Sequence, residues 1–129
     1  MIDVIKLKKI RLDKKGMQSF LGPLETDVLL ALWKLEKART REVYSLLKNR
    51  RKVALTSVAV MLDRLHQKGI VVRTIEDGRG GGHYIYAPKT SRQEFEESVI
   101  GNTVNKLINS FGDVAANYFY KRFSKRRGR

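Results

Sequence analysis

The chain has 129 residues, of which 42% are hydrophobic, so it can bury a core and is not disordered throughout. It carries 27 Lys and Arg residues against 13 Asp and Glu residues, a net charge of +14. Such an excess attracts polyanions, and nucleic acid is the expected partner. The absence of cysteine excludes disulfides, thiolate metal sites and a cysteine nucleophile.

Nothing in the sequence indicates catalysis, metal binding or membrane insertion. The two histidines, His66 and His83, lie apart, and no nucleophile–base pair or group of clustered carboxylates is visible. No apolar run approaches the roughly 18 residues that a membrane span requires, and residues 1–15 alternate apolar and basic side chains, unlike a signal peptide. We expect that the protein is not an enzyme, binds no metal or cofactor, does not contact a membrane and is located in the cytoplasm.

The positive charge is concentrated in three places. Residues 1–20 contain six basic and two acidic residues, and residues 121–129 contain six basic residues and no acid. The segment 37–92 contains 13 basic and four acidic residues, whereas 93–120 contains one basic and four acidic residues. The central segment is therefore suited to meet an anion, while the two basic tails either grip a phosphate backbone or only keep the chain soluble.

Three short helices are predicted in the first half of the chain. Pro23 after Gly22 fits the first position of a helix, and Thr40 and Thr56 are predicted N-caps. Apolar residues recur at helical spacing after each of these starts, and Gly69 suits the end of the third helix. The predicted helices span residues 23–36, 41–50 and 57–68. Their close spacing, with a polar outer face on the third, indicates a helix-turn-helix.

A β-hairpin is predicted next. Residues 70–75 and 83–87 have the composition and alternation of strands, and they flank a glycine-rich turn. The glycines do not form a nucleotide-binding loop, because neither a Gly-Lys-Ser/Thr sequence nor a helix follows them. Three helices followed by a hairpin is the order of a winged-helix DNA-binding domain.

Two further helices are predicted after the hairpin. Ser91 and Glu94 form a capping box for a helix over 92–110, and Gly112 separates this helix from a last one over 114–123. The first of them carries a heptad-like seam that is expected to join two chains, formed by Ile100, Val104, Leu107 and Phe111. Phe119 on the last helix is a further predicted dimerisation residue. Since the winged helix is complete before this seam, the apolar face meets a second chain or else folds back on its own winged helix.

Four stretches of the chain resemble one family of regulators. They are Leu21-Gly22-Pro23-Leu24-Glu25 running into Leu32-Trp33, Thr40-Arg41-Glu42-Val43-Tyr44, Thr56-Ser57-Val58 through Arg64-Leu65 to Lys68-Gly69, and Tyr84-Ile85-Tyr86-Ala87-Pro88. In order and spacing they resemble the penicillinase-repressor-type regulators, the BlaI/MecI group with the copper-responsive CopY proteins as relatives, over about residues 21–111. The resemblance implies a dimeric repressor with an N-terminal winged helix and a C-terminal helical dimerisation arm.

The chain departs from these relatives in two ways. The copper-responsive members end in a cysteine-rich metal site, which a chain without cysteine lacks. In the antibiotic-responsive members, a membrane sensor pathway leads to cleavage at an Asn–Phe bond of the arm. The matching bond here is Asn117–Tyr118, but a basic tail replaces the acidic, leucine-rich segment that follows it in those relatives. We expect Asn117 to be an ordinary helix or turn residue, and an inducer or sensor protein stays an open question.

The predicted fold class is mainly α with a small β-hairpin, a winged helix-turn-helix followed by a C-terminal helical dimerisation arm. Its parts are a basic N-terminal tail (1–20), a winged-helix DNA-binding domain (21–89), a helical dimerisation region (90–120) and a basic C-terminal tail (121–129).

The predicted DNA contacts lie on and around the third helix. Thr56 and Ser57 at its start can bond to bases or phosphates, and Val60 can touch a thymine methyl group. Arg64 pairs with guanine, or else holds a phosphate or its neighbour Asp63. The remaining members of the predicted set flank the helix, end it or lie at the tip of the wing: Arg50, Arg51, Lys52, Gln67 and Arg79.

Two functions compete on this evidence. The first is a homodimeric, sequence-specific repressor that binds an inverted-repeat operator in double-stranded DNA. The second is a basic architectural protein that coats DNA with little sequence preference, which the two basic tails favour. Selection of bound sequences from random DNA separates them by the presence or absence of an enriched inverted repeat.

Overall fold

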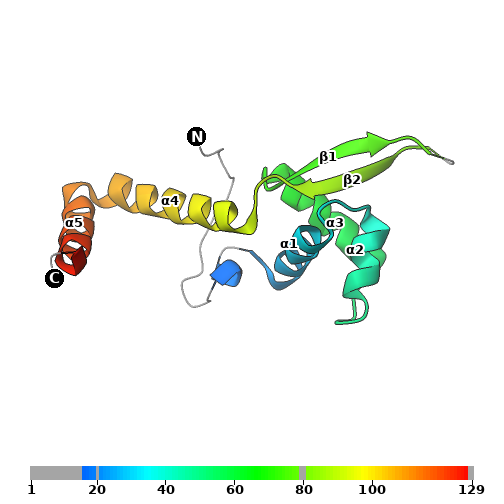
Figure 1. Ribbon diagram of the computed structural model, residues 1–129, viewed down its shortest axis with the longest axis horizontal. Coiled ribbons are helices and arrows are strands. Elements are labelled where there is room, and N and C mark those ends of the chain that lie inside the picture. Colours follow the sequence, from blue (N-terminus) through cyan, green and yellow to red (C-terminus); the bar gives the residue numbers. More distant parts are fainter. Residues whose placement is uncertain (1–15, 20, 79–80, 128–129) are drawn as a thin grey trace. The chain divides into compact units, whose positions relative to one another are not determined.

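The computed structural model describes residues 16–19, 21–78 and 81–127 (Figure 1). The predicted N-terminal tail as far as residue 15 and the predicted DNA contact Arg79 lie outside these ranges. The elements, in chain order, are η1 (Gly16–Ser19), α1 (Pro23–Leu35), α2 (Thr40–Leu47), α3 (Leu55–Gln67), β1 (Val71–Glu76), β2 (His83–Pro88), α4 (Arg92–Phe111) and α5 (Asp113–Arg127). The predicted fold class, mainly helical with one small hairpin in winged-helix order, is confirmed.

The chain divides within α4 into two compact units, Met1–Phe95 and Glu96–Arg129. In the first unit, α1, α2 and α3 pack against one another around an apolar core. The side chains at the centre of this core come from the stripes that the periodicity predicts: Val28, Leu29, Leu32, Val43, Leu47, Val58, Leu62 and Leu65. Each contributes about 1.5–3 kcal/mol through burial.

Local contacts decide where the three helices begin and end. Helix α1 begins at Pro23 as predicted, and the Gly22 N–H donates to Glu25 Oε1 at 3.2 Å. Glu36, in the left-handed region at φ 72°, ends it. The second oxygen of Glu25, Oε2, pairs with Lys68 Nζ just after α3 at 2.7 Å. Because Glu25 is only 7% exposed, this ion pair ties the start of α1 to the end of α3 away from water.

The predicted N-caps are wrong. Thr40 is the first residue of α2 and Thr56 the second residue of α3, and the N-caps are Arg39 and Ala54. At the start of α2 the hydrogen bond runs from the N-cap backbone to a helix side chain: the Arg39 backbone N–H donates to the Glu42 carboxylate at 2.8 Å. Helix α2 also ends at Leu47, earlier than predicted, because residues 48–50 form a turn.

The hairpin is antiparallel, and its register runs from Val71 opposite Pro88 to Glu76 opposite His83. Its strand β1 packs against α3 and β2 against α1. The sheet gains one bridge from the connection between α1 and α2, where Ala38 exchanges hydrogen bonds of 2.9 and 2.8 Å with Tyr86. This bridge draws the connection to the hairpin and so places it beside α3.

The start of α4 is held to the first unit. Ser91 and Glu94 form the predicted capping box, with bonds of 3.1 Å from the Glu94 N–H to Ser91 Oγ and 3.0 Å from the Ser91 N–H to Glu94 Oε1. Trp33 of α1 donates from Nε1 to the Thr90 carbonyl at 2.9 Å, and its ring lies 5.8 Å from that of Phe95. Trp33 is thus half-buried as a packing residue, with its polar atom satisfied.

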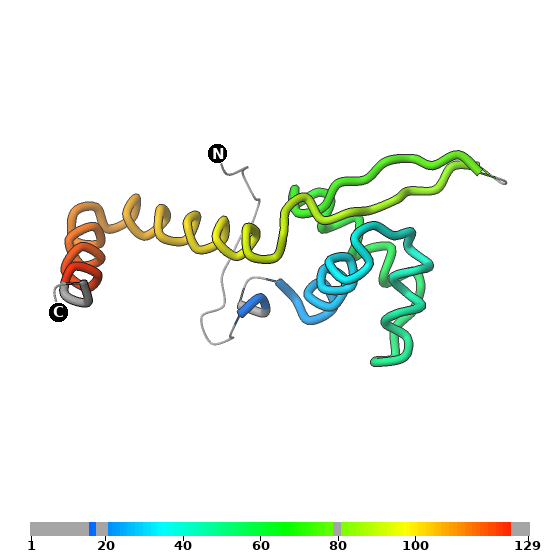
Figure 2. The backbone as a smooth tube through the Cα atoms, viewed as in Figure 1, coloured from blue at the N-terminus to red at the C-terminus, as the bar shows by residue number. Residues whose placement is uncertain are grey.

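The second unit contains the rest of α4 and α5, which meet at Gly112 (Figure 2). Gly112 has φ 62°, a conformation that side chains disfavour, and it separates the helices as predicted. Helix α5 runs on to Arg127, past the predicted end at residue 123. Most of the segment 121–129 is therefore helix rather than an irregular tail.

Candidate nucleic-acid interface

The outer face of α3 is free of the protein's own core. Thr56, Val60, Arg64 and Gln67 are exposed, and Ser57 is half-buried. They lie opposite the buried stripe because residues three or four apart share one side of a helix. Val60 is 47% exposed, so its methyl groups are open to contact from outside the chain. The structure thus brings together all five outward residues that the sequence assigned to α3.

A groove of about 1100 Å³ opens beside the start of α3. One wall is α3 itself, another is the connection between α1 and α2, and the third is the hairpin. Apolar side chains and cations share its lining: Lys37, Ala38, Arg39, Thr40, Arg41, Glu42, Leu55, Thr56, Ala59, Thr74, Ile75, Glu76, His83, Tyr84 and Ile85. The groove makes the outer face of α3 and the hairpin parts of one continuous surface.

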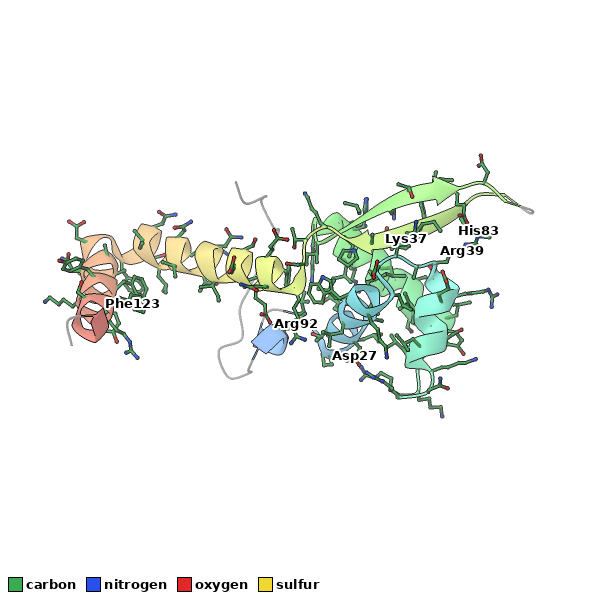
Figure 3. The ribbon with its side chains drawn as sticks, viewed as in Figure 1. Asp27, Lys37, Arg39, His83, Arg92 and Phe123 are labelled. Atoms are coloured by element: carbon green, nitrogen blue, oxygen red, sulfur yellow. The ribbon has the colours of Figure 1, made fainter. Side chains whose placement is uncertain are left out.

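The cations of this groove come from a segment that sequence reasoning did not single out. Lys37, Arg39 and Arg41 lie just before α2 or at its start, and Figure 3 labels the first two beside the hairpin that carries His83. Arg39 pairs with Glu76 of β1. Lys37 and Arg41 are exposed and make no ion pair within the described ranges. The positive charge of segment 37–92 was visible in the sequence, but its gathering here depends on the Ala38–Tyr86 bridge.

The basic connection before α3 is only partly free. Arg50 and Lys52 are exposed and, among the described residues, have no ion-pair partner. Arg51 pairs with Asp27 of α1, a residue labelled in Figure 3. That pair offsets the charge of Arg51 and tethers the connection to α1. Of the three cations that the sequence assigned here, two therefore present unpaired charge.

A network joins α3 to the hairpin. Arg73 of β1 donates from Nη1 to Asp63 Oδ1 at 3.0 Å, and its guanidinium lies 4.1 Å from the centre of the Tyr84 ring. Hydrogen bonding with Tyr86, and more weakly with Asp63, raises the pKa of Arg73 above its ordinary value, so it stays cationic. Gln67 donates to the other oxygen of Asp63 at 2.7 Å. Arg73 is a member of this face that the sequence analysis missed, because its partners lie on other elements.

This network bears on the alternatives for Arg64. Both oxygens of Asp63 are engaged by other residues. No ion pair joins Arg64 to its neighbour in the described structure, and the Arg64 side chain is exposed. In this structure Arg64 therefore does not hold Asp63, and its guanidinium is exposed.

The predicted dimerisation residues lie on α4 and α5. Ile100 and Phe111 are each 62% exposed and Leu107 is 39% exposed, whereas Val104 and Phe119 are half-buried. Further apolar side chains, not foreseen as part of this surface, are exposed on α5: Val114, Tyr118, Tyr120 and Phe123. The Asn117–Tyr118 bond lies inside α5, as expected for an ordinary helix residue.

The described residues hold neither a metal-binding cluster nor a membrane-spanning helix. Within residues 16–19, 21–78 and 81–127, no three His, Cys, Asp or Glu side chains gather as a metal site would need. None of the helices in those ranges has the length and hydrophobicity to span a bilayer.

Comparison with known proteins decides the family. The family model described as penicillinase repressor matches residues 21–126. The chain belongs to the penicillinase repressor family. The match runs through α4 and α5, farther than the four stretches of resemblance reached. As a member of this family, the protein is a DNA-binding transcriptional regulator and not an enzyme.

Solved structures support the fold. A protein described as a possible transcriptional regulator from Methanosarcina mazei Go1 is 21% identical, with a TM-score of 0.52 over 78% of each chain. The Aeropyrum pernix Orc1 protein in complex with DNA is 24% identical, with a TM-score of 0.52 over 67% of this chain and 26% of that one. The match thus spans about a quarter of the Orc1 chain. No curated protein sequence matches this chain.

Proposed function

We propose that this family member is a sequence-specific repressor that binds an inverted-repeat operator as a homodimer. The observation that carries the proposal is the outer face of α3, which is exposed at Thr56, Val60, Arg64 and Gln67 and continues into the basic groove beside it. A helix of this kind fits the major groove, where each base pair presents its own pattern of donors and acceptors. The same role implies action in the cytoplasm, where the operator would lie.

The side chains on this surface have separable tasks. Thr56 and Ser57 at the start of α3, and Arg64 and Gln67 farther along it, can reach base edges, while Val60 offers a methyl contact for thymine. The unpaired cations around the helix would hold phosphates and set the register: Lys37, Arg41, Arg50 and Lys52. Arg79 at the wing tip is proposed as a further backbone or minor-groove contact.

The homodimer is proposed from the apolar side chains of the second unit. Ile100, Leu107 and Phe111 recur at heptad-like spacing on α4 and are exposed in a single chain. The segment 93–120 is net acidic, so it is poorly suited to contact DNA itself. A twofold pair would bury this seam and present two α3 helices to successive major-groove faces.

An architectural, sequence-tolerant role is the competing function. It is favoured by the basic end of α5, where Lys121 and Arg122 are exposed on a helix that continues to Arg127. Such charges bind any phosphate backbone, without regard to sequence.

Selection of bound duplexes from random DNA tests the proposal. The expected result is an enriched inverted repeat whose half-sites are separated by about one helical turn, 10–10.5 base pairs. A protein that binds DNA but enriches no motif would contradict the repressor and leave the architectural role.

A further inference from the structure

An acidic side chain lies in the middle of the proposed DNA-reading helix. Asp63 follows Val60 by three residues and precedes Gln67 by four, so all three share the outer side of α3. Its side chain is 47% exposed. Phosphates repel a carboxylate, so an acid at this position opposes binding to DNA unless its charge is offset and it has something to accept from a base.

The protein offsets this charge from the hairpin. Arg73 Nη1 lies 3.0 Å from Asp63 Oδ1, and the Arg73 side chain is only 23% exposed. The guanidinium is itself fixed by the Tyr84 ring, 4.1 Å away. Arg73 is therefore a positioning residue, which holds the carboxylate in one orientation and cancels its charge at the surface.

Gln67 holds the second oxygen of the Asp63 carboxylate. A carboxylate can only accept, so the Gln67 amide must donate its N–H to Asp63 Oδ2, at 2.7 Å. Within the described structure, its single oxygen, Oε1, and its second N–H both stay free on the exposed amide. Each Asp63 oxygen has one bond and keeps a further lone pair. The carboxylate thus offers the DNA two fixed acceptors.

In the major groove, only some bases supply a donor to such a pair. Cytosine presents the N4 amino group, and adenine presents the N6 amino group next to the acceptor N7. Guanine presents two acceptors, N7 and O6, and thymine presents the acceptor O4 beside a methyl group. The two carboxylate oxygens of Asp63 are repelled by the acceptors of guanine and thymine and by N7 of adenine, which leaves cytosine as the best partner of this side chain.

We propose that Asp63, held by Arg73 and Gln67, determines specificity for a cytosine in each half-site and excludes guanine from that position. This inference rests on the proposed function, because it names the base that one part of the reading helix selects. It adds the acid Asp63 and the hairpin residue Arg73 to the residues that decide the operator.

The test is selection from random duplex DNA with the full wild-type chain and with two variants that each remove one negative charge. Asp63→Asn keeps the size of the side chain but adds an amide donor, whereas Asp77→Asn makes the same charge change on the exposed turn of the hairpin. The wild type should enrich a motif with one position restricted to cytosine. Asp63→Asn should lower the preference for cytosine over guanine there by about 5- to 150-fold, the range of one good base contact. Asp77→Asn should leave the motif unchanged and raise affinity for all sequences alike.

A third variant removes the residue that holds Asp63 in place. Arg73→Gln should relax the same cytosine position and no other, since Asp63 then loses its orientation. Circular dichroism melting of each variant verifies that the winged helix is folded before its motif is read.

Two outcomes have different meanings. If the wild type enriches a motif and Asp63→Asn leaves every position unchanged, or shifts it no more than Asp77→Asn, the inference is overturned while the proposed function stands. If the wild type enriches no motif at all, the sequence-specific repressor fails and the inference falls with it.

Discussion

Replacement of apolar side chains by acidic ones on the seam of α4 tests the homodimer most directly. Leu107→Asp combined with Phe111→Asp places two carboxylates where two protomers are proposed to meet. Phe111 is 62% and Leu107 39% exposed in a single chain. The double change should therefore leave the fold of one protomer intact and act on association.

The expected loss of dimerisation free energy follows from the part of the two side chains that is still exposed in a single chain. Full burial of a Leu or Phe side chain contributes about 1.5–3 kcal/mol. Scaled by the exposed fractions, burial against a partner contributes about 0.6–1.2 kcal/mol for Leu107 and about 0.9–1.9 kcal/mol for Phe111. A twofold dimer contains each side chain twice, so the double variant should lose about 3–6 kcal/mol, or about 10²- to 10⁴-fold in dimer Kd. Desolvation of the new carboxylates adds to this loss.

Sedimentation velocity at micromolar concentration, off DNA, measures the effect. The matched control is Asn105→Asp combined with Asn109→Asp, which adds the same charges to exposed positions on the opposite side of α4. Wild type and control should sediment as dimers and the seam variant as a monomer with weaker operator binding. A monomeric wild type, or a seam variant that dimerises as tightly as the control, would refute the reasoning.

Three further outcomes are expected. If about 6–10 phosphates are contacted, affinity for DNA should fall about 10³- to 10⁵-fold between 50 and 200 mM salt in a fluorescence titration; a nearly constant affinity would contradict the electrostatic role of the basic groove. Val60→Ala and Arg64→Ala should each change the bases preferred at one position, at about 1–3 kcal/mol for each true base contact, and an unaltered selected motif would place recognition elsewhere. Lys68→Ala should lower the free energy of unfolding in urea by about 1.5–3 kcal/mol, because it leaves the Glu25 carboxylate without its charged partner. The control Lys34→Ala, at an exposed position, should change that free energy by less than about 0.5 kcal/mol. Equal losses for the two variants would argue against a stabilising role for the Glu25–Lys68 pair.

Elements whose signals are local could be predicted from the sequence. Ser91 and Glu94 satisfy each other's backbone N–H groups within a span of four residues, so the start of α4 is readable without the fold. The break at Gly112 is equally local, because it needs only a residue that adopts positive φ. The N-caps at Thr40 and Thr56 were mispredicted, because a hydroxyl side chain indicates a cap only when the backbone leaves the helix at that residue.

The sequence by itself determined which side of α3 faces outward, since helical periodicity depends on residues three and four apart. Only the tertiary structure decided which basic residues near α3 remain unpaired. Arg51 and Arg64 look alike in the sequence, yet Asp27, 24 residues before Arg51, pairs with it, and Arg64 has no ion-pair partner in the described ranges. Likewise, Arg73 reaches α3 only because β1 packs against that helix. Periodicity is a property of neighbouring residues along one segment, whereas an ion pair requires two segments to approach within a few ångströms, and the packed core sets that distance.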